Sequence, residues 1–262
     1  FASEPRIRVI SLPSNIGYGL AINRGLEDVL YPITFILNND LLLKEDSVKP
    51  LFEHMTEDTF AVFGWQRVIN AKGSIVYGGC TVKFWYGMYR YGQQFGGDFS
   101  SQNEPKESWY ASGAAAFYDT DKLRQLGGFA PQYAPAYWED VDISHRAWQR
   151  GWRVMSIPTV PVDHWHESTA KTMPFWLIGA LHQRNWWLFH WANLRQPGFW
   201  IRHILWLPVN LVRETYRKPV APIGLVWALL SIFKIVRFRA KQHVIFNDQA
   251  IINAILSSSK RR

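Results

Sequence analysis

The sequence predicts an α/β fold in which helices cover a largely parallel sheet. Short apolar runs of strand length alternate with runs of helical periodicity from residue 6 to residue 158. Gly, Asn and Asp close most of these runs, as expected at turns. Because strands that alternate with helices usually form layered α/β folds, we expect one such domain with a sizeable core, for which the 48% apolar content suffices.

The expected elements follow in chain order. Residues 13–30 combine a glycine-containing turn with a helix that has Leu20, Leu26 and Leu30 on one face. Residues 109–129 predict a strand, a helix that begins at an aspartate, and a Gly-Gly stop. Strands are also expected at residues 6–12, 33–37 and 151–158 and as a pair within 60–80, a further helix at 47–55, and a long loop at 86–108.

Charge divides the chain near residue 170. Residues 1–169 carry 15 Lys and Arg against 19 Asp and Glu, whereas residues 170–262 carry 14 against two and hold seven of the fourteen tryptophans. Basic charge with interfacial aromatics favours a membrane surface, and the chain has no nucleic-acid-binding motif. We therefore expect an α/β domain at 1–170 and a helical, membrane-associated region at 171–262, on the cytoplasmic face of the cell membrane.

Residues 219–233 form an uncharged run of fifteen that begins with prolines. This run is short for a membrane span, which needs roughly 20 apolar residues. In-plane or re-entrant helices are the favoured interpretation. The alternative is a set of helices packed on the catalytic domain.

The cysteine content and the N-terminus lead to two further expectations. Cys80 is the single cysteine, so an internal disulfide is excluded. The chain begins at Phe1 without a signal-peptide pattern, and its first predicted strand has the composition of an interior strand. We expect that an N-terminal part of a longer protein is missing.

The stretch LNND places Asn38, Asn39 and Asp40 at the end of a predicted strand. Ligands bind at the carboxyl ends of strands in open α/β sheets. A hard cation such as Mg²⁺ takes one or two carboxylates plus phosphate oxygens. A plain Asx turn explains the same residues.

The stretch YWEDVDISHRA places Glu139, Asp140 and Asp142 at the start of a helix expected from Val141 to Arg150. Asp140 as N-cap and Asp142 as a complement to the helix dipole form one explanation. It leaves Glu139 unexplained. A carboxylate beside other acids has a raised pKa, which suits a general base, so capping and catalysis both remain open.

The stretch VDHWHES holds His164 and His166 after a predicted strand. This H-x-H spacing allows a metal ligand, although an isolated pair is more often structural. Zinc hydrolases use denser His and Asp clusters, and no second cluster is present in the sequence.

Together these stretches resemble family 2 glycosyltransferases. The resemblance covers residues 7–170 and extends at 184–194 to polysaccharide-building members, including rhamnosyltransferase-like ones. It implies a GT-A fold, a Rossmann-like mixed sheet, with the helical membrane-associated region appended. The stretches that carry it, in order, are SNIGYGLAINRG, FILNND, WYASGAAAFYDTDKLRQLGGF, YAPAYWEDVDISHRAWQRGWRV and VDHWHES.

The resemblance also implies roles. Asp140 in the Glu139-Asp140 pair would be the base, and Asp40 with His164 or His166 would contact a divalent cation, Mg²⁺ or Mn²⁺, on the donor diphosphate. Other residues are expected to contact substrate: Asn15, Gly17, Asn23, Asn38, Ser112, Gly113, Ala114, Trp138 and Asp142.

The implied reaction is inverting transfer of a sugar from a nucleoside-diphosphate sugar to a glycan or polyprenyl-linked acceptor. One departure is large, because the usual first unit, a strand, x-P-x-Y-N and a helix, has no counterpart here. In the family that unit holds the nucleobase and ribose, so the isolated chain is expected to bind sugar nucleotide poorly and to turn over little. A non-catalytic, transferase-like membrane-bound module for glycan binding or assembly is therefore the alternative.

Overall fold

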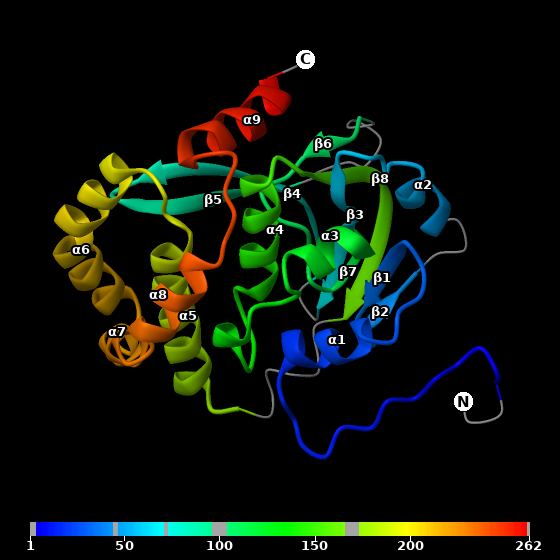
Figure 1. Ribbon diagram of the computed structural model, residues 1–262, viewed down its shortest axis with the longest axis horizontal. Coiled ribbons are helices and arrows are strands. Elements are labelled where there is room, and N and C mark those ends of the chain that lie inside the picture. The colour runs from blue at the N-terminus through cyan, green and yellow to red at the C-terminus, as the bar shows by residue number, and fades with distance from the viewer. Residues whose placement is uncertain (1–3, 44–46, 71–72, 96–103, 166–172, 261–262) are drawn as a thin grey trace.

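The computed structural model describes residues 4–43, 47–70, 73–95, 104–165 and 173–260 (Figure 1). These residues form a mixed sheet at one end of the molecule, a layer of helices at the other, and α4 between them. The strands are β1 Ile33–Leu37, β2 Leu41–Leu42, β3 Thr59–Asn70, β4 Gly73–Trp85, β5 Met88–Phe95, β6 Lys106–Glu107, β7 Ala115–Asp119 and β8 Arg153–Trp165. The helices are α1 Tyr18–Leu26, α2 Val48–Phe52, α3 Thr120–Gln125, α4 Glu139–Gln149, α5 Phe175–Asn193, α6 Pro197–Arg217, α7 Ala221–Leu229, α8 Ile232–Ala240 and α9 Asp248–Lys260, with a 3₁₀ turn at Pro131–Tyr133.

The sheet is mixed, and most of its pairings are antiparallel. The order is β1-β7-β3-β4-β5, and β8 pairs with β3, β2 and β6. Among the described strands, β3 and β8 form the parallel pair, and the other pairings are antiparallel. The prediction of a largely parallel sheet was therefore wrong. For β3, β4 and β5 the physical reason is the connection length. These strands follow one another with connections of two residues, which can join only antiparallel strands.

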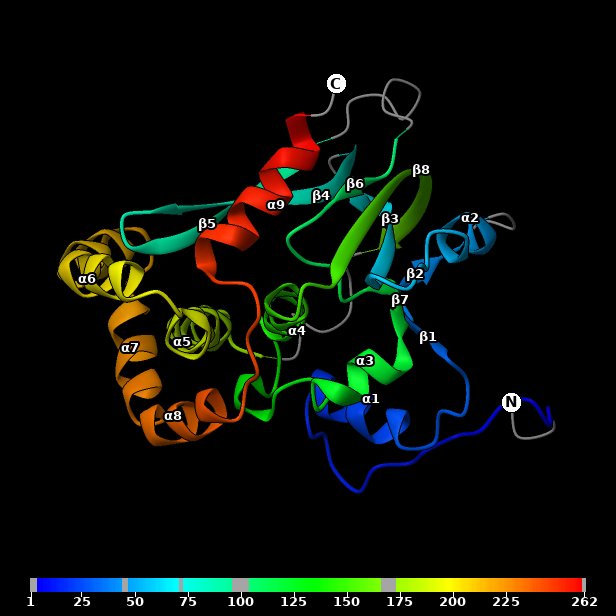
Figure 2. The ribbon, with the colours of Figure 1, turned by 45° about the horizontal axis from the view of Figure 1, so that its top comes forward.

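Two predictions near the N-terminus were also wrong. Residues 6–12 form no strand and instead run along the outside of the molecule (Figure 2), with Val9 68% exposed. A strand needs the backbone of a neighbour, and none of the described strands pairs with this segment. Helix α1 ends at Leu26, so Leu30 lies beyond it and is 91% exposed.

The expected loop at residues 86–108 contains β5, which pairs with β4 along most of its length. The β4–β5 ribbon reaches α6, where the rings of Phe84 and Phe199 lie 4.1 Å apart. His190 in α5 accepts a hydrogen bond of 2.9 Å from the backbone N–H of Tyr89. The ribbon thus joins the sheet to the C-terminal helices.

Helix α4 begins at Glu139 rather than Val141, and Trp138, not Asp140, is its N-cap residue. Trp138 adopts the left-handed region with φ 74°, which few non-glycine residues adopt. Its side chain makes no capping bond. Asp140 lies in the first turn, so the capping interpretation of Asp140 was wrong and its carboxylate is available for another contact.

A buried network holds α4. The Asp142 carboxylate accepts a 2.7 Å bond from Arg146 Nε, and it also accepts bonds from Tyr133 and Asn193 of 2.9 and 2.8 Å. Arg146 donates further bonds to the carbonyls of Leu126 and Gly128. The network connects α4 to the loop after α3, to the 3₁₀ turn and to α5.

The C-terminal helices divide into two groups. Helix α5 is buried along most of its length and shares the main core with α4 and the sheet, and α9 packs against β4. Helices α6, α7 and α8 lie at the end of the molecule away from β1 in both views (Figures 1 and 2). The predicted boundary at residue 170 falls outside the described residues. No one helix within them has the length and apolar character of a membrane span, although α7 and α8, bent by 60°, meet that test as a pair.

We predict that Arg146→Leu lowers the free energy of unfolding by about 3–5 kcal/mol, because it leaves the charge of Asp142 buried without its ion-pair partner. Urea unfolding followed by tryptophan fluorescence measures the loss. Arg150→Leu, at the end of the same helix, is the control and should cost about 1 kcal/mol, since Arg150 lies over the Trp152 ring at 5.9 Å. Equal losses for the two variants would contradict the assigned role of Arg146.

Candidate active site

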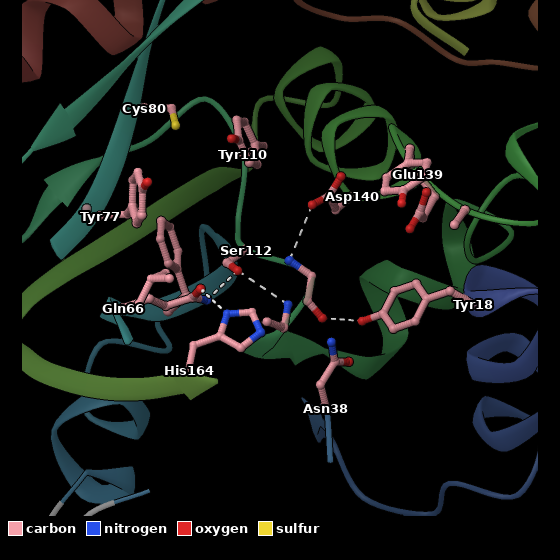
Figure 3. A pocket seen from close by; sticks show the side chains of 17 residues that line it. Tyr18, Asn38, Gln66, Tyr77, Cys80, Tyr110, Ser112, Glu139, Asp140 and His164 are labelled. Carbon is pink, nitrogen blue, oxygen red and sulfur yellow. Dashed lines mark hydrogen bonds between the residues drawn. The ribbon is translucent and has the colours of Figure 1, made fainter. Parts of the chain in front are cut away.

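A cavity of about 540 Å³ opens between the sheet and the first turn of α4 (Figure 3). The ends of β1 and β8 and the middle of β3 line one side, and the acid pair of α4 lines the other. The cavity therefore brings together side chains far apart in sequence. Its lining residues are Tyr18, Asn38, Phe63, Gln66, Val68, Tyr77, Gly78, Cys80, Tyr110, Ser112, Gly113, Ala114, Ala136, Tyr137, Glu139, Asp140 and His164.

Sheet pairing places Asp40 beside His164. Strand β2 begins directly after Asp40, and its register sets Leu41 opposite His164 in β8. The Asp40 Oδ2 atom lies 3.4 Å from His164 Nε2. Asp40 is not among the cavity-lining residues, whereas its neighbour His164 is.

A polar bridge spans the sheet side of the cavity. Gln66 in β3 contacts His164 Nδ1 through Oε1 at 3.3 Å and donates from Nε2 to the Ser112 hydroxyl. On the outer side of the same strands, Arg67 and Asp163 form a two-bond ion pair of 2.7 and 2.6 Å. These contacts fix the orientation of His164 relative to Ser112.

The segment 112–114 links β1 to α4. The backbone N–H of Asn38 donates to the carbonyl of Ala114 at 2.8 Å, which extends the β1–β7 pairing to the cavity edge. The backbone N–H of Gly113 donates to Asp140 Oδ2 at 3.3 Å, and the Tyr18 hydroxyl donates to the Gly113 carbonyl. In Figure 3 these groups run as a chain between the two sides of the cavity.

The acid pair has shifted ionisation. Burial, followed by the charge of Asp140, raises the pKa of Glu139 to about 8. Burial also raises the pKa of Asp140, while the N–H groups of Val141 and Gly113 act to lower it. Because these N–H groups stabilise the carboxylate form of Asp140, and Glu139 Oε2 is buried with no hydrogen-bond partner among the described residues, we assign the shared proton near neutral pH to Glu139. Asp140 is then the ionised member.

Other residues predicted to contact substrate lie elsewhere. Asn15 accepts a bond from the N–H of Gly17, whose φ of 90° and close approach to Pro135 suit glycine alone. Asn23 bonds both the N–H and the carbonyl of Phe129. None of these three predicted residues lines the cavity; they hold α1 against the loops after α3.

Three further predicted residues have different positions. Trp138 lines a second cavity, on the other side of the acid pair. Asp142 is fully buried in the α4 network and reaches neither cavity. His166 lies outside the described residues.

Sequence reasoning missed several lining residues. Gln66 and Arg67 follow the apolar run of residues 60–65 in β3, and that break in the pattern was a usable signal. Tyr18, Tyr110 and Tyr137 come from turns and helix ends, where sequence periodicity does not indicate direction. Burial raises the pKa of Cys80 to about 12, so its thiol stays protonated and unreactive at neutral pH.

Asp40 and His164 fit a divalent cation as two ligands of a larger set. A carboxylate and an imidazole suit Mn²⁺ better than Mg²⁺, which prefers oxygen ligands. Across the described residues there is no cluster of three or more His, Cys, Asp or Glu side chains that could hold a metal alone. A cation here would thus take its remaining ligands from a diphosphate or from water.

Comparisons with known proteins found a matching family model and similar solved structures. The model of the family described as "Glycosyl transferase family 2" matches residues 1–127. Among solved structures the chain is similar to GalNAc-T7 with UDP, GalNAc and Mn²⁺, at 15% identity and a TM-score of 0.53 over 69% of this chain and 35% of that one. It is also similar to the mannosyltransferase PcManGT from Pyrobaculum calidifontis in complex with GDP-Man and Mn²⁺, at 14% identity and a TM-score of 0.44 over 94% of this chain and 67% of that one. The comparison with curated proteins found no match.

The mixed sheet with its cavity thus has the fold of the GT-A glycosyltransferases. The family 2 model covers 127 of the 262 residues of the chain, which is just under half. The chain spans about a third of the length of GalNAc-T7.

We predict that Glu139→Gln stabilises the protein at alkaline pH and not at acidic pH. The raised pKa of Glu139 makes the folded state hold a proton that the unfolded state loses above its ordinary value of 4.5, so stability falls as pH rises from about 4.5 to about 8. Each pKa unit corresponds to about 1.4 kcal/mol, so the gain at pH 8.5 should be on the order of a few kcal/mol.

Urea unfolding at pH 5 and pH 8.5 measures this difference. Glu57→Gln, which changes an exposed glutamate, is the matched control and should shift stability little at either pH. If wild type and Glu139→Gln show the same pH dependence, Glu139 does not hold the proton.

Proposed function

We propose that the chain is an inverting glycosyltransferase that moves a sugar from a nucleoside-diphosphate sugar to a glycan or polyprenyl-linked acceptor in cell-surface polysaccharide synthesis. One observation carries the proposal. Asn38 and His164 on the sheet side and Glu139 and Asp140 on the helix side line the same cavity. Its volume of about 540 Å³ suits a small-molecule site.

The donor would lie on the sheet side. Asp40 and His164 would hold the divalent cation together with the donor diphosphate, and the cation would neutralise the charge that develops on the leaving group. Ser112 and Gly113 border the space between this side and Asp140, where the sugar would lie. The complex of GalNAc-T7 with UDP and Mn²⁺ is consistent with this assignment. A rhamnosyl donor is one candidate, by resemblance.

Asp140 would act as the general base. It takes the proton of an acceptor hydroxyl while the hydroxyl oxygen attacks the anomeric carbon. The bond from that carbon to the diphosphate oxygen breaks, and the nucleoside diphosphate leaves with the electron pair. One displacement inverts the configuration, and the N–H groups of Gly113 and Val141 hold the carboxylate in place for it.

We predict that Asp140→Asn lowers the transfer rate by about 10²–10⁴-fold, because the amide cannot accept the proton. A panel of UDP-, GDP- and dTDP-sugars, with release of nucleoside diphosphate as readout, first identifies the donor for the wild type. Binding of the matching nucleotide should persist in the variant. Asp121→Asn, on the exposed face of α3, is the control.

A near-wild-type rate for Asp140→Asn would remove Asp140 from the base role. Absence of transfer by the full-length protein with every donor of the panel would favour the non-catalytic module.

Helices α6–α8 are proposed to rest on an anionic membrane at the cytoplasmic face of the cell. Along α6 the exposed apolar residues recur at helical spacing and form one stripe, and α7 and α8 add more. Exposed Lys and Arg side chains accompany them, and anionic lipids of the cytoplasmic leaflet attract such charge. The exposed apolar residues are Ile201, Ile204, Leu205, Val209, Val212, Tyr216, Ile223, Val226, Leu229, Leu230, Phe233 and Val236.

We predict that the double variant Leu230→Glu/Phe233→Glu weakens binding to vesicles at least tenfold, since two side chains that are 79% and 80% exposed would change from apolar to charged. Co-sedimentation with phosphatidylglycerol–phosphatidylcholine vesicles measures it. Leu30→Glu changes an equally exposed leucine near α1 and should leave binding unchanged. If Leu30→Glu weakened vesicle binding as much as the double variant, α7 and α8 would not be the membrane-binding surface.

A further inference from the structure

A second cavity, of about 820 Å³, lies on the other side of the acid pair. Residues of β5, α4, α5 and α6 enclose it. It shares Tyr110, Tyr137, Glu139 and Asp140 with the first cavity. A group bound here would face Asp140 from the side opposite the Asp40–His164 pair.

Aromatic rings form much of the wall. The ring of Tyr137 stacks on His182 at 3.9 Å, and Trp138 packs against the core at Phe189. Flat aromatic faces are a lining that suits a ring-shaped ligand. The aromatic lining residues are Tyr89, Tyr91, Tyr110, Tyr137, Trp138 and Trp186.

The cavity also has a cationic part of its wall. Arg90 lies over the Trp186 ring at 4.9 Å and bonds Asn210 at 2.9 Å, with Glu214 at 3.4 Å. Its Nε is buried and has no hydrogen-bond partner among the described residues. An acceptor oxygen from a ligand would satisfy this donor.

Two more cations stand at the end of α6, at the cavity wall. Arg217 and Lys218 line the cavity, and the residues that the structure describes give neither an acidic partner. Burial, and then the charge of Lys218, lower the pKa of His182 to about 4, so this imidazole is neutral near pH 7. Glu214 offsets one of the three cations, which leaves positive charge at this wall.

We propose that the second cavity is the acceptor site and that it binds a saccharide carrying a phosphate or diphosphate. This inference rests on the proposed function. The sugar lies against the aromatic wall with a hydroxyl toward Asp140, and the phosphate contacts Arg217, Lys218 and the free Nε of Arg90. Phosphate oxygens form strong charge-assisted bonds with such cations.

The position of the cationic wall favours a lipid as the source of the phosphate. Tyr216, next to Arg217, is 92% exposed and belongs to the apolar stripe of α6. A chain attached to a phosphate at Arg217 and Lys218 could therefore leave the cavity along that stripe. A soluble phosphorylated sugar shares the phosphate chemistry but has no apolar chain to contact the apolar stripe of α6.

Geranyl diphosphate and inorganic pyrophosphate test the site by calorimetry on the full chain, with EDTA present so that a cation cannot hold the probe at Asp40 and His164. Arg217→Ser/Lys218→Ser should weaken binding of both probes at least tenfold. Arg237→Ser/Lys241→Ser on and just after α8 removes the same charge from exposed positions and should change affinity less than twofold. Geranyl diphosphate at least tenfold tighter than pyrophosphate supports a lipid-linked acceptor; equal affinities support a free phosphorylated one.

Three results would overturn the inference: no binding by the wild type, equal weakening by both double variants, or loss of binding in His164→Ala, which would place the probe in the first cavity. Binding of UDP or GDP with Mn²⁺ is measured separately on the full-length protein. Its absence would count against the donor site and the proposed function, whereas failure of the diphosphate probes alone would remove only the acceptor assignment.

Discussion

The buried ion pair of Asp142 and Arg146 determines where the acid pair stands. Both side chains are almost fully buried, and their bonds reach the loop after α3, the 3₁₀ turn and α5. Charges buried in this way are tolerated only when each is paired and hydrogen-bonded. Since Glu139 and Asp140 precede Asp142 within one helical turn, fixing Asp142 also fixes their direction toward the space between the two cavities.

Helix α5 takes part in the same constraint from outside the sheet. Asn185 donates to the carbonyls of Tyr133, Ala136 and Tyr137, and Arg184 donates to the carbonyl of Ala134. These bonds shape the segment that leads into α4, including the left-handed Tyr137 and Trp138. The basic, tryptophan-rich composition after residue 170 suggested a peripheral region, but burial shows that its first helix is part of the scaffold of the site.

The sequence predicted elements wherever the local pattern and the tertiary environment agree. Strand β1 and helix α3, whose N-cap is Asp119, have both a clear apolar pattern and local stop signals, and the structure confirms them. Residues 6–12 have the same apolar pattern but no neighbouring strand, and pattern alone cannot supply one. Strand β5 is the reverse case, because its glycine and glutamines weaken the strand signal of its tyrosines and pairing with β4 determines its conformation.

The difference between local pattern and tertiary environment also applies to the two cavities of the site. The motifs indicated Asn38, Glu139, Asp140 and His164, which carry their signal in short local stretches, and the structure places all four around one cavity. The second cavity could not be seen in this way, because Arg90 and the pair Arg217 and Lys218 meet only through the packing of β5 against α6. If the two cavities hold donor and acceptor as proposed, acceptor specificity in this chain should depend on the β5–α6 contact more than on any residue of the strand ends.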